Sequence, residues 1–114
     1  MFDLAREGAT DELAGHIDAG VPVNLTDASG NTLVMLAAYH GQAATVAALT
    51  QRGADPNRAN DKGQTPLAGA VFKGARDVVE ALVAAGADPT LGAPSALEAA
   101  RYFGQDELIG LLGG

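Results

Sequence analysis

Glycine recurs along this 114-residue chain at a fixed interval. Gly8, Gly41 and Gly74 follow one another at steps of 33 residues (41−8 = 33 and 74−41 = 33). The same step relates Gly20, Gly53 and Gly86, Thr32 and Thr65, Leu49 and Leu82, and Asp55-Pro56 and Asp88-Pro89. A period of this length predicts a stack of similar units, each of which buries its apolar face only against its neighbours.

The last unit keeps the pattern but is shorter. Ser95, Leu97 and Gly104 correspond to Thr65, Leu67 and Gly74 at a spacing of 30 residues, so three residues are missing from the last turn. We therefore predict one domain over residues 1–114, with units at approximately 1–26, 27–59, 60–91 and 92–114.

Each unit contains the boundaries of a short helix. Thr32, Thr65 and Ser95 precede helical stretches, where a side-chain oxygen can accept from a free amide of the first turn. Pro66 suits the first helical position, because its missing N–H leaves no hydrogen bond unmade there. Glycine at 41, 74 and 104 then ends these helices, where a left-handed conformation is often needed.

A second helix follows in each unit. Val78, Val79, Leu82 and Val83 recur at helical spacing, which predicts one apolar face. We expect an all-α fold: a slightly curved slab of helix pairs. Gly69 lies inside a predicted helix at a cost of about 1 kcal/mol relative to alanine. Either the third unit is locally soft, or a neighbouring side chain packs onto Gly69.

The third unit, with its Gly63-Gln64-Thr65-Pro66-Leu67 run, Gly74 and the Gly86-Ala87-Asp88-Pro89 ending, resembles the ankyrin repeat. The histidine that follows Thr-Pro-Leu in that family is replaced here by Ala68. The resemblance implies a solenoid of four stacked helix-turn-helix units, the first and last acting as caps. It also implies a non-enzymatic protein–protein interaction module that binds through a concave face and turn fingers.

Both ends of the chain have features expected of caps. The first unit lacks the turn before its first helix, and the last unit places Arg101, Gln105, Asp106 and Glu107 among its apolar residues. Terminal units of a repeat stack need a polar outer face. On this basis we expect a complete small protein rather than a fragment of a longer array.

Composition narrows the possible partners and the location. A formal net charge of −7 argues against binding to nucleic acid or to anionic membranes, and no export signal is visible. Zero cysteines exclude disulfides and thiolate metal sites and suit a reducing compartment, so we expect a cytoplasmic protein. Many Ala and Gly residues, with Arg preferred over Lys, indicate a GC-rich bacterial source.

The sequence contains no catalytic constellation. His16 and His40 are the only histidines, and neither lies in a metal-binding pattern. No phosphate-binding glycine loop is present, and the adjacent carboxylates Asp11-Glu12 and Asp106-Glu107 point in different directions on a helix. We predict neither an enzyme nor a cofactor or metal site. A catalytic or ligand-binding protein would need a concave pocket, which this pattern does not indicate.

Three of the five aromatic residues occupy one slot of the repeat. Tyr39, Phe72 and Tyr102 stand two places before Gly41, Gly74 and Gly104, and Arg6 takes this slot in the first unit. The resemblance implies that the slot faces inward and contacts partners. Aromatic side chains dominate many interface hot spots. The rings could equally stack on one another between units, and the sequence leaves both readings open.

Charge indicates a two-sided molecule. By the resemblance, Arg6, Arg52, Lys62 and Lys73 belong to the concave face or the fingers, whereas most acidic residues fall on second helices. The predicted protein-binding residues are Arg6, Asn31, Tyr39, His40, Arg52, Lys62, Gln64, Phe72, Lys73, Tyr102 and Phe103. We expect a monomer when free and a partner with an acidic and apolar surface. The alternatives are a dedicated inhibitor or protective partner of one enzyme or toxin, and an adaptor with several weak partners.

Overall fold

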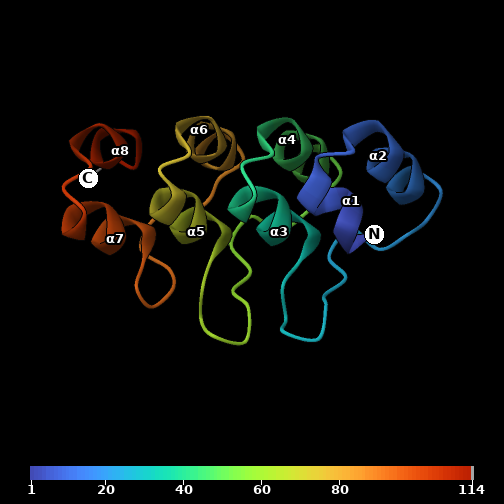
Figure 1. Ribbon diagram of the computed structural model, residues 1–114, viewed down its shortest axis with the longest axis horizontal. Helices are drawn as coiled ribbons and strands as arrows, with labels where there is room; N and C mark the ends of the chain where they lie inside the picture. Colours follow the sequence, from blue (N-terminus) through green and yellow to red (C-terminus); the bar gives the residue numbers. More distant parts are fainter. Residues whose placement is uncertain (114) are drawn as a thin grey trace.

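A computed structural model describes residues 1–113 and contains eight helices over that range. Their bounds are α1 Phe2–Glu7, α2 Thr10–Asp18, α3 Leu33–Tyr39, α4 Ala43–Gln51, α5 Pro66–Lys73, α6 Arg76–Ala84, α7 Ala96–Tyr102 and α8 Asp106–Leu111. They form four successive helix pairs along an axis 41 Å long (Figure 1). The prediction of an all-helical repeat solenoid is confirmed.

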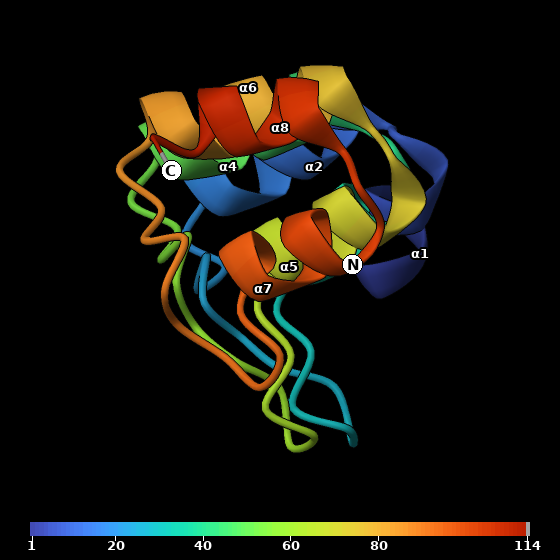
Figure 2. The ribbon, with the colours of Figure 1, turned by 90° about the vertical axis from the view of Figure 1, so that its left-hand side faces the viewer.

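The helices form two layers. Helices α1, α3, α5 and α7 make an inner row, and α2, α4, α6 and α8 make an outer row (Figures 1 and 2). Each helix contacts its partner in the same unit and its counterparts in adjacent units. The loops that enter α3, α5 and α7 extend beyond the inner row, away from the outer row (Figure 2). We call the first two fingers, residues 26–32 and 59–65.

Hydroxyl side chains begin the inner helices, as predicted. Oγ1 of Thr32 accepts from the Met35 amide at 3.1 Å, and Oγ1 of Thr65 accepts from the Ala68 amide at 3.2 Å. Ser95 accepts from the Glu98 amide, and the Glu98 carboxylate accepts in return from the Ser95 amide. All three hydroxyl residues are buried, so their polar groups need these partners.

Glycine follows the inner helices in the left-handed conformation that the sequence predicts. Gly74 comes directly after α5 with φ +66°, and its amide donates to the Val71 carbonyl. Helices α3 and α7 end one residue earlier, at Tyr39 and Tyr102, before Gly41 and Gly104. The chain therefore turns sharply after each inner helix and enters the outer one.

The apolar core lies between the two layers and between adjacent units. In α3, every residue from Leu33 to Ala38 is buried, because other helices surround it. In α6, by contrast, only Val78, Val79 and Leu82 are buried. The outer helices are thus amphipathic, whereas the central inner helices are apolar almost all round.

Asparagine side chains also connect adjacent units. Oδ1 of Asn24 accepts from the Asp55 amide at 2.9 Å, and Oδ1 of Asn57 accepts from the Asp88 amide at 2.7 Å. A local turn bond forms beside them, since Asp55 accepts from the Asn57 amide. The asparagine contacts repeat every 33 residues (57−24 = 33), which explains why this residue type shares the period.

No helix within residues 1–113 is long and apolar enough to cross a bilayer. The predicted polar caps remain a prediction: Arg101 is exposed at the last inner helix, while Ile109 and Leu111 of α8 are only partly buried. Gly114, at the predicted carboxyl end of the last unit, lies outside the described residues.

Replacing Thr65 tests how much the hydroxyl group that caps the start of α5 stabilises the fold. We expect Thr65→Ala to lower the free energy of unfolding by about 1 kcal/mol, because the first turn of α5 loses its side-chain acceptor. Thr65→Ser keeps the hydroxyl and should lose clearly less. Urea titration monitored by circular dichroism measures both values. Equal losses in the two variants would show that methyl packing, rather than the cap, stabilises this position.

Candidate functional site

The shared aromatic slot opens onto a groove in the inner helix layer. Tyr39, Phe72 and Tyr102 have exposed fractions of 39%, 60% and 85%, high values for large apolar side chains. They come from α3, α5 and α7 and converge on a groove of about 620 Å³, hereafter the aromatic groove. It is lined by Met35, Tyr39, Gln64, Ala68, Gly69, Phe72, Pro94, Glu98, Ala99, Tyr102 and Phe103.

The three slot rings do not form one continuous stack. Phe103 packs edge to face against Phe72 and Tyr102, with centroid separations of 5.9 and 5.1 Å. Tyr39 contacts Lys73 instead, whose Nζ lies 4.5 Å from the ring centroid. Phe103 thus joins two of the slot rings, and all three slot rings still expose a large area, so their contact with a partner stays a prediction.

Small residues form the floor of the aromatic groove. A β-carbon at Gly69 would lie 3.6 Å from Met35 Cε and 3.6 Å from Tyr39 Cδ2. Neighbouring side chains thus pack onto Gly69, which decides between the two explanations offered for this glycine. Ala68 and Ala99 lie beside it among the aromatic walls. The expectation that the chain lacks a concave pocket is wrong, because these small residues leave space that repeat spacing does not reveal.

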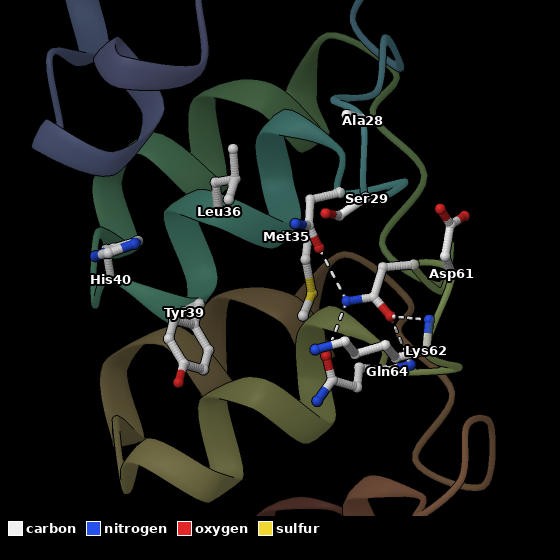
Figure 3. Close-up of a pocket in the computed structure, with 11 residues that line it drawn as sticks. Ala28, Ser29, Met35, Leu36, Tyr39, His40, Asp61, Lys62 and Gln64 are labelled. Atoms are coloured by element: carbon white, nitrogen blue, oxygen red, sulfur yellow. Dashed lines mark hydrogen bonds between the residues drawn. The ribbon is translucent and has the colours of Figure 1, made fainter.

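A second hollow adjoins the aromatic groove at the fingers (Figure 3). This finger pocket has a volume of about 410 Å³. Its lining is Ala28, Ser29, Asn31, Met35, Leu36, Tyr39, His40, Asn60, Asp61, Lys62 and Gln64. Met35, Tyr39 and Gln64 line both hollows, so the two form one continuous surface.

Asn60 holds the two fingers together. Its Nδ2 donates to Asn31 Oδ1 and to Gln64 Oε1, both at 2.9 Å (Figure 3). Its Oδ1 accepts from the amides of Lys62 and Gln64 at 3.0 Å. Asn60 is not among the predicted binding residues, although it lies 33 positions after Asp27, which accepts from the amides of Ser29 and Asn31 in its own finger. Asn31 and Gln64 are therefore structural as well as surface residues.

The basic residues fall into two groups. Lys62 and Lys73 make no ion pair within residues 1–113, whereas Arg6 pairs with Asp3 at 2.8 Å. Arg52 follows α4 in the outer layer and pairs with Asp18 at 2.9 Å. The prediction that Arg52 lies on the concave face or a finger is wrong, because the end of an outer helix carries it to the other layer.

Two further predicted binding residues, His40 and Arg6, lie in different parts of the inner side. His40 lines the finger pocket, with its ring edge-on to Tyr39 at 5.7 Å. Arg6, at the end of α1, lines neither hollow.

The predicted acidic side of the molecule is the outer layer. Its acidic residues are Asp11, Glu12 and Asp18 on α2, Asp77 and Glu80 on α6, and Asp106 and Glu107 on α8. Within residues 1–113, no cluster of His, Asp and Glu side chains is arranged to hold a metal ion.

Two carboxylates near the surface are held in their charged form. The Ser95 amide donates to Glu98 and lowers the pKa of that carboxyl below its usual 4.5. Burial acts to raise the pKa of Asp27, but hydrogen bonds from Asn31 and Ser29 outweigh it and leave the pKa lowered. Both groups are therefore ionised at neutral pH, and both carboxylates are already engaged in hydrogen bonds within the fold.

The lowered pKa of Glu98 predicts a pH dependence. A carboxyl whose folded pKa lies below its unfolded value stabilises the fold above the unfolded pKa, and this contribution is lost as the pH falls through the folded one. Glu98→Gln keeps an acceptor oxygen but cannot ionise. We expect the difference in Tm between the wild type and Glu98→Gln to shrink as the pH falls from 6 to 3. A difference independent of pH in thermal melts would contradict the assignment.

The position of Gly69 predicts a stabilising substitution. Gly69→Ala should raise the free energy of unfolding by up to about 1 kcal/mol, because alanine favours the helix and its β-carbon meets neighbours at ordinary contact distance. Gly74→Ala is the control: its φ of +66° is left-handed, so a side chain there should destabilise by about 1–2 kcal/mol. Chemical denaturation measures both, and a destabilising Gly69→Ala would show that the groove floor cannot accept a methyl group.

Comparison with known proteins identifies the family. The family model for ankyrin repeats in three copies matches residues 2–93. The chain therefore belongs to the ankyrin repeat family, a class of non-catalytic folds that generally mediate protein–protein interaction.

Relatives occur in bacteria and in mammals. An ankyrin repeat protein of Pseudomonas aeruginosa is 48% identical over 46 residues, which cover 40% of this chain and 27% of that protein. Ankyrin repeat family A protein 2 of Homo sapiens is 45% identical over 56 residues, which cover 49% of this chain and 18% of the relative. The chain therefore spans about a quarter or less of these curated relatives.

The fold also matches a solved structure. The crystal structure of the human ASB11 ankyrin repeat domain superposes with a TM-score of 0.85 at 29% sequence identity. The match covers 97% of this chain and 51% of that one. The four helix pairs of this chain thus correspond to about half of that ankyrin repeat domain.

Proposed function

We propose that this chain binds a partner protein through the aromatic groove and the adjoining finger pocket. The observation that carries the proposal is the convergence of exposed aromatic rings from three successive inner helices on one groove. Membership of a family of interaction modules supports it. Of the predicted residues, Asn31, Tyr39, His40, Lys62, Gln64, Phe72, Tyr102 and Phe103 line one of the two hollows.

The chemistry of this surface suits a protein partner. Tyr and Phe side chains bury a large area at little cost in side-chain entropy, and they are common at the centres of interfaces. Lys62 and Lys73 add positive charge beside them, while the acidic side chains of α2, α6 and α8 lie in the outer layer. Partners with acidic groups around an apolar patch would associate most readily. We expect such a complex to form in a reducing compartment, with the free chain monomeric.

Removing the slot rings tests this proposal. We expect the triple variant Tyr39→Ala, Phe72→Ala, Tyr102→Ala to recover at least about tenfold less partner after affinity capture from a lysate of the source organism. The matched control is Val83→Ala, which removes an exposed apolar side chain from α6 in the outer layer. Quantitative mass spectrometry gives the recovered amounts, and circular dichroism verifies the fold of each variant.

The same experiment separates the kinds of partner. A single protein recovered in a tight one-to-one complex would identify a dedicated inhibitor or protective partner, whereas several weakly held proteins would identify an adaptor. Unchanged recovery with the triple variant, while the fold stays intact, would assign the aromatic stripe a purely structural role.

A further inference from the structure

We propose that the aromatic groove and the finger pocket together bind one extended segment of the partner, which carries a large apolar residue and, about two to three residues away, an Asp or Glu. The inference rests on the proposed function and goes beyond it by naming the chemistry of the bound segment. Its basis is the continuity of two hollows with different characters, one largely apolar and one largely polar, together with two lysines that make no ion pair within residues 1–113.

The aromatic groove offers a place for one large apolar side chain. Ala68, Gly69 and Ala99 form a floor without long side chains, and Phe72, Tyr102 and Phe103 form the walls. Its volume of about 620 Å³ lies within the range of small-ligand sites and holds side chains of a single segment. An α-helix with its side chains is about 10–12 Å across, so an extended segment fits this space better.

The finger pocket offers positive charge. Lys62 lines it, and Lys73 places its ammonium over the Tyr39 ring, which lines both hollows. Neither lysine has an acidic partner within residues 1–113. Figure 3 shows Met35 directed into the space between Tyr39 and Gln64 of the second finger, where the two hollows meet. A carboxylate bound on this side would supply the missing counter-charge for both lysines.

Two acidic residues of the surface set the direction of the segment. Glu98 lines the aromatic groove and keeps its negative charge while it accepts from the Ser95 amide. A second carboxylate would therefore be repelled there. Asp61 lines the finger pocket, but its carboxylate points away from Tyr39 and His40 (Figure 3). The acidic residue of the partner therefore belongs beside the lysines, and the apolar residue belongs near α7.

Helix spacing fixes the distance between the two residues. Packed helices lie about 8–10 Å apart, and an extended chain advances about 3.3–3.6 Å per residue. One unit step along the inner row therefore corresponds to about two to three residues of an extended segment. The hydrophobic residue and the carboxylate of the partner are predicted at this separation.

Selection from a display library of random 12-residue peptides tests the inference with the full chain as target. We expect enriched peptides to share a large apolar residue with an Asp or Glu about two to three residues away. For synthesised, fluorescein-labelled versions, anisotropy titrations should give a Kd at least about tenfold higher with Gly69→Leu, which fills the groove floor. Tyr102→Ser, at an 85% exposed position, is a second groove variant that leaves the core intact.

The lysines are tested separately. Lys62→Gln with Lys73→Gln should raise the Kd several-fold and flatten its dependence on salt, because an ion pair is screened by added ions. Val83→Ala in the outer layer should leave the Kd unchanged. Replacing the acidic residue of the peptide by Gln should weaken the wild type more than the double-lysine variant.

Several results would overturn the inference. They are the absence of enriched peptides, enriched peptides without the acidic residue, and a Kd unaffected by Gly69→Leu and Tyr102→Ser. A concentration-dependent dimer that Tyr102→Ser abolishes, seen by sedimentation velocity, would assign the groove to a second copy of the chain. Capture of a protein that depends on the three slot rings, combined with any of these results, would leave the proposed function standing while this inference fails.

Discussion

The inability of one helix pair to bury its own apolar surface is the constraint on which this structure depends. Stacking against neighbouring units buries the apolar surface of each pair. In the two central inner helices, all residues from Leu33 to Ala38 of α3 and from Pro66 to Val71 of α5 are buried. In these two central helices only the last positions are exposed, whereas α1 and α7 also expose Asp3 and Glu98. On the inner side of the central units, freely variable side chains are therefore restricted to the helix ends and the fingers, and the aromatic slot lies at the helix ends.

The groove follows from the same packing. Adjacent inner helices approach closely because alanine and glycine occur along them, and Gly69 receives Met35 and Tyr39 on its bare backbone. A glycine that weakens an isolated helix is thus a packing surface within the stack. The same small residue leaves a hollow between α5 and α7, so Gly69 both receives packed side chains and opens the groove proposed to bind a partner.

The ion pairs of the outer layer involve arginines, whereas two lysines of the inner side make no ion pair within residues 1–113. Arg76 pairs with Glu80 and with Glu107 of the next unit, and Arg52 pairs with Asp18, all in the outer layer. These contacts neutralise arginines where most acidic residues lie. Lys62 and Lys73 have no such partner within residues 1–113, so a chain with net charge −7 still presents two unpaired ammonium groups on its inner side, near the hollows that Asp61 and Glu98 also line. Association with an acidic segment can then be favoured although the whole molecule is acidic.

The sequence by itself determined the helices, their caps, the repeat period and the shared aromatic slot, because these depend on local backbone chemistry and on spacing along the chain. Thr65, Pro66 and Gly74 therefore take the roles predicted from neighbouring residues alone. Only the tertiary structure decided that Arg52 belongs to the outer layer, that Asn60 joins two fingers and that a groove opens above Gly69. Each of these depends on which atoms meet across units, and the distances between units are not contained in the repeat period.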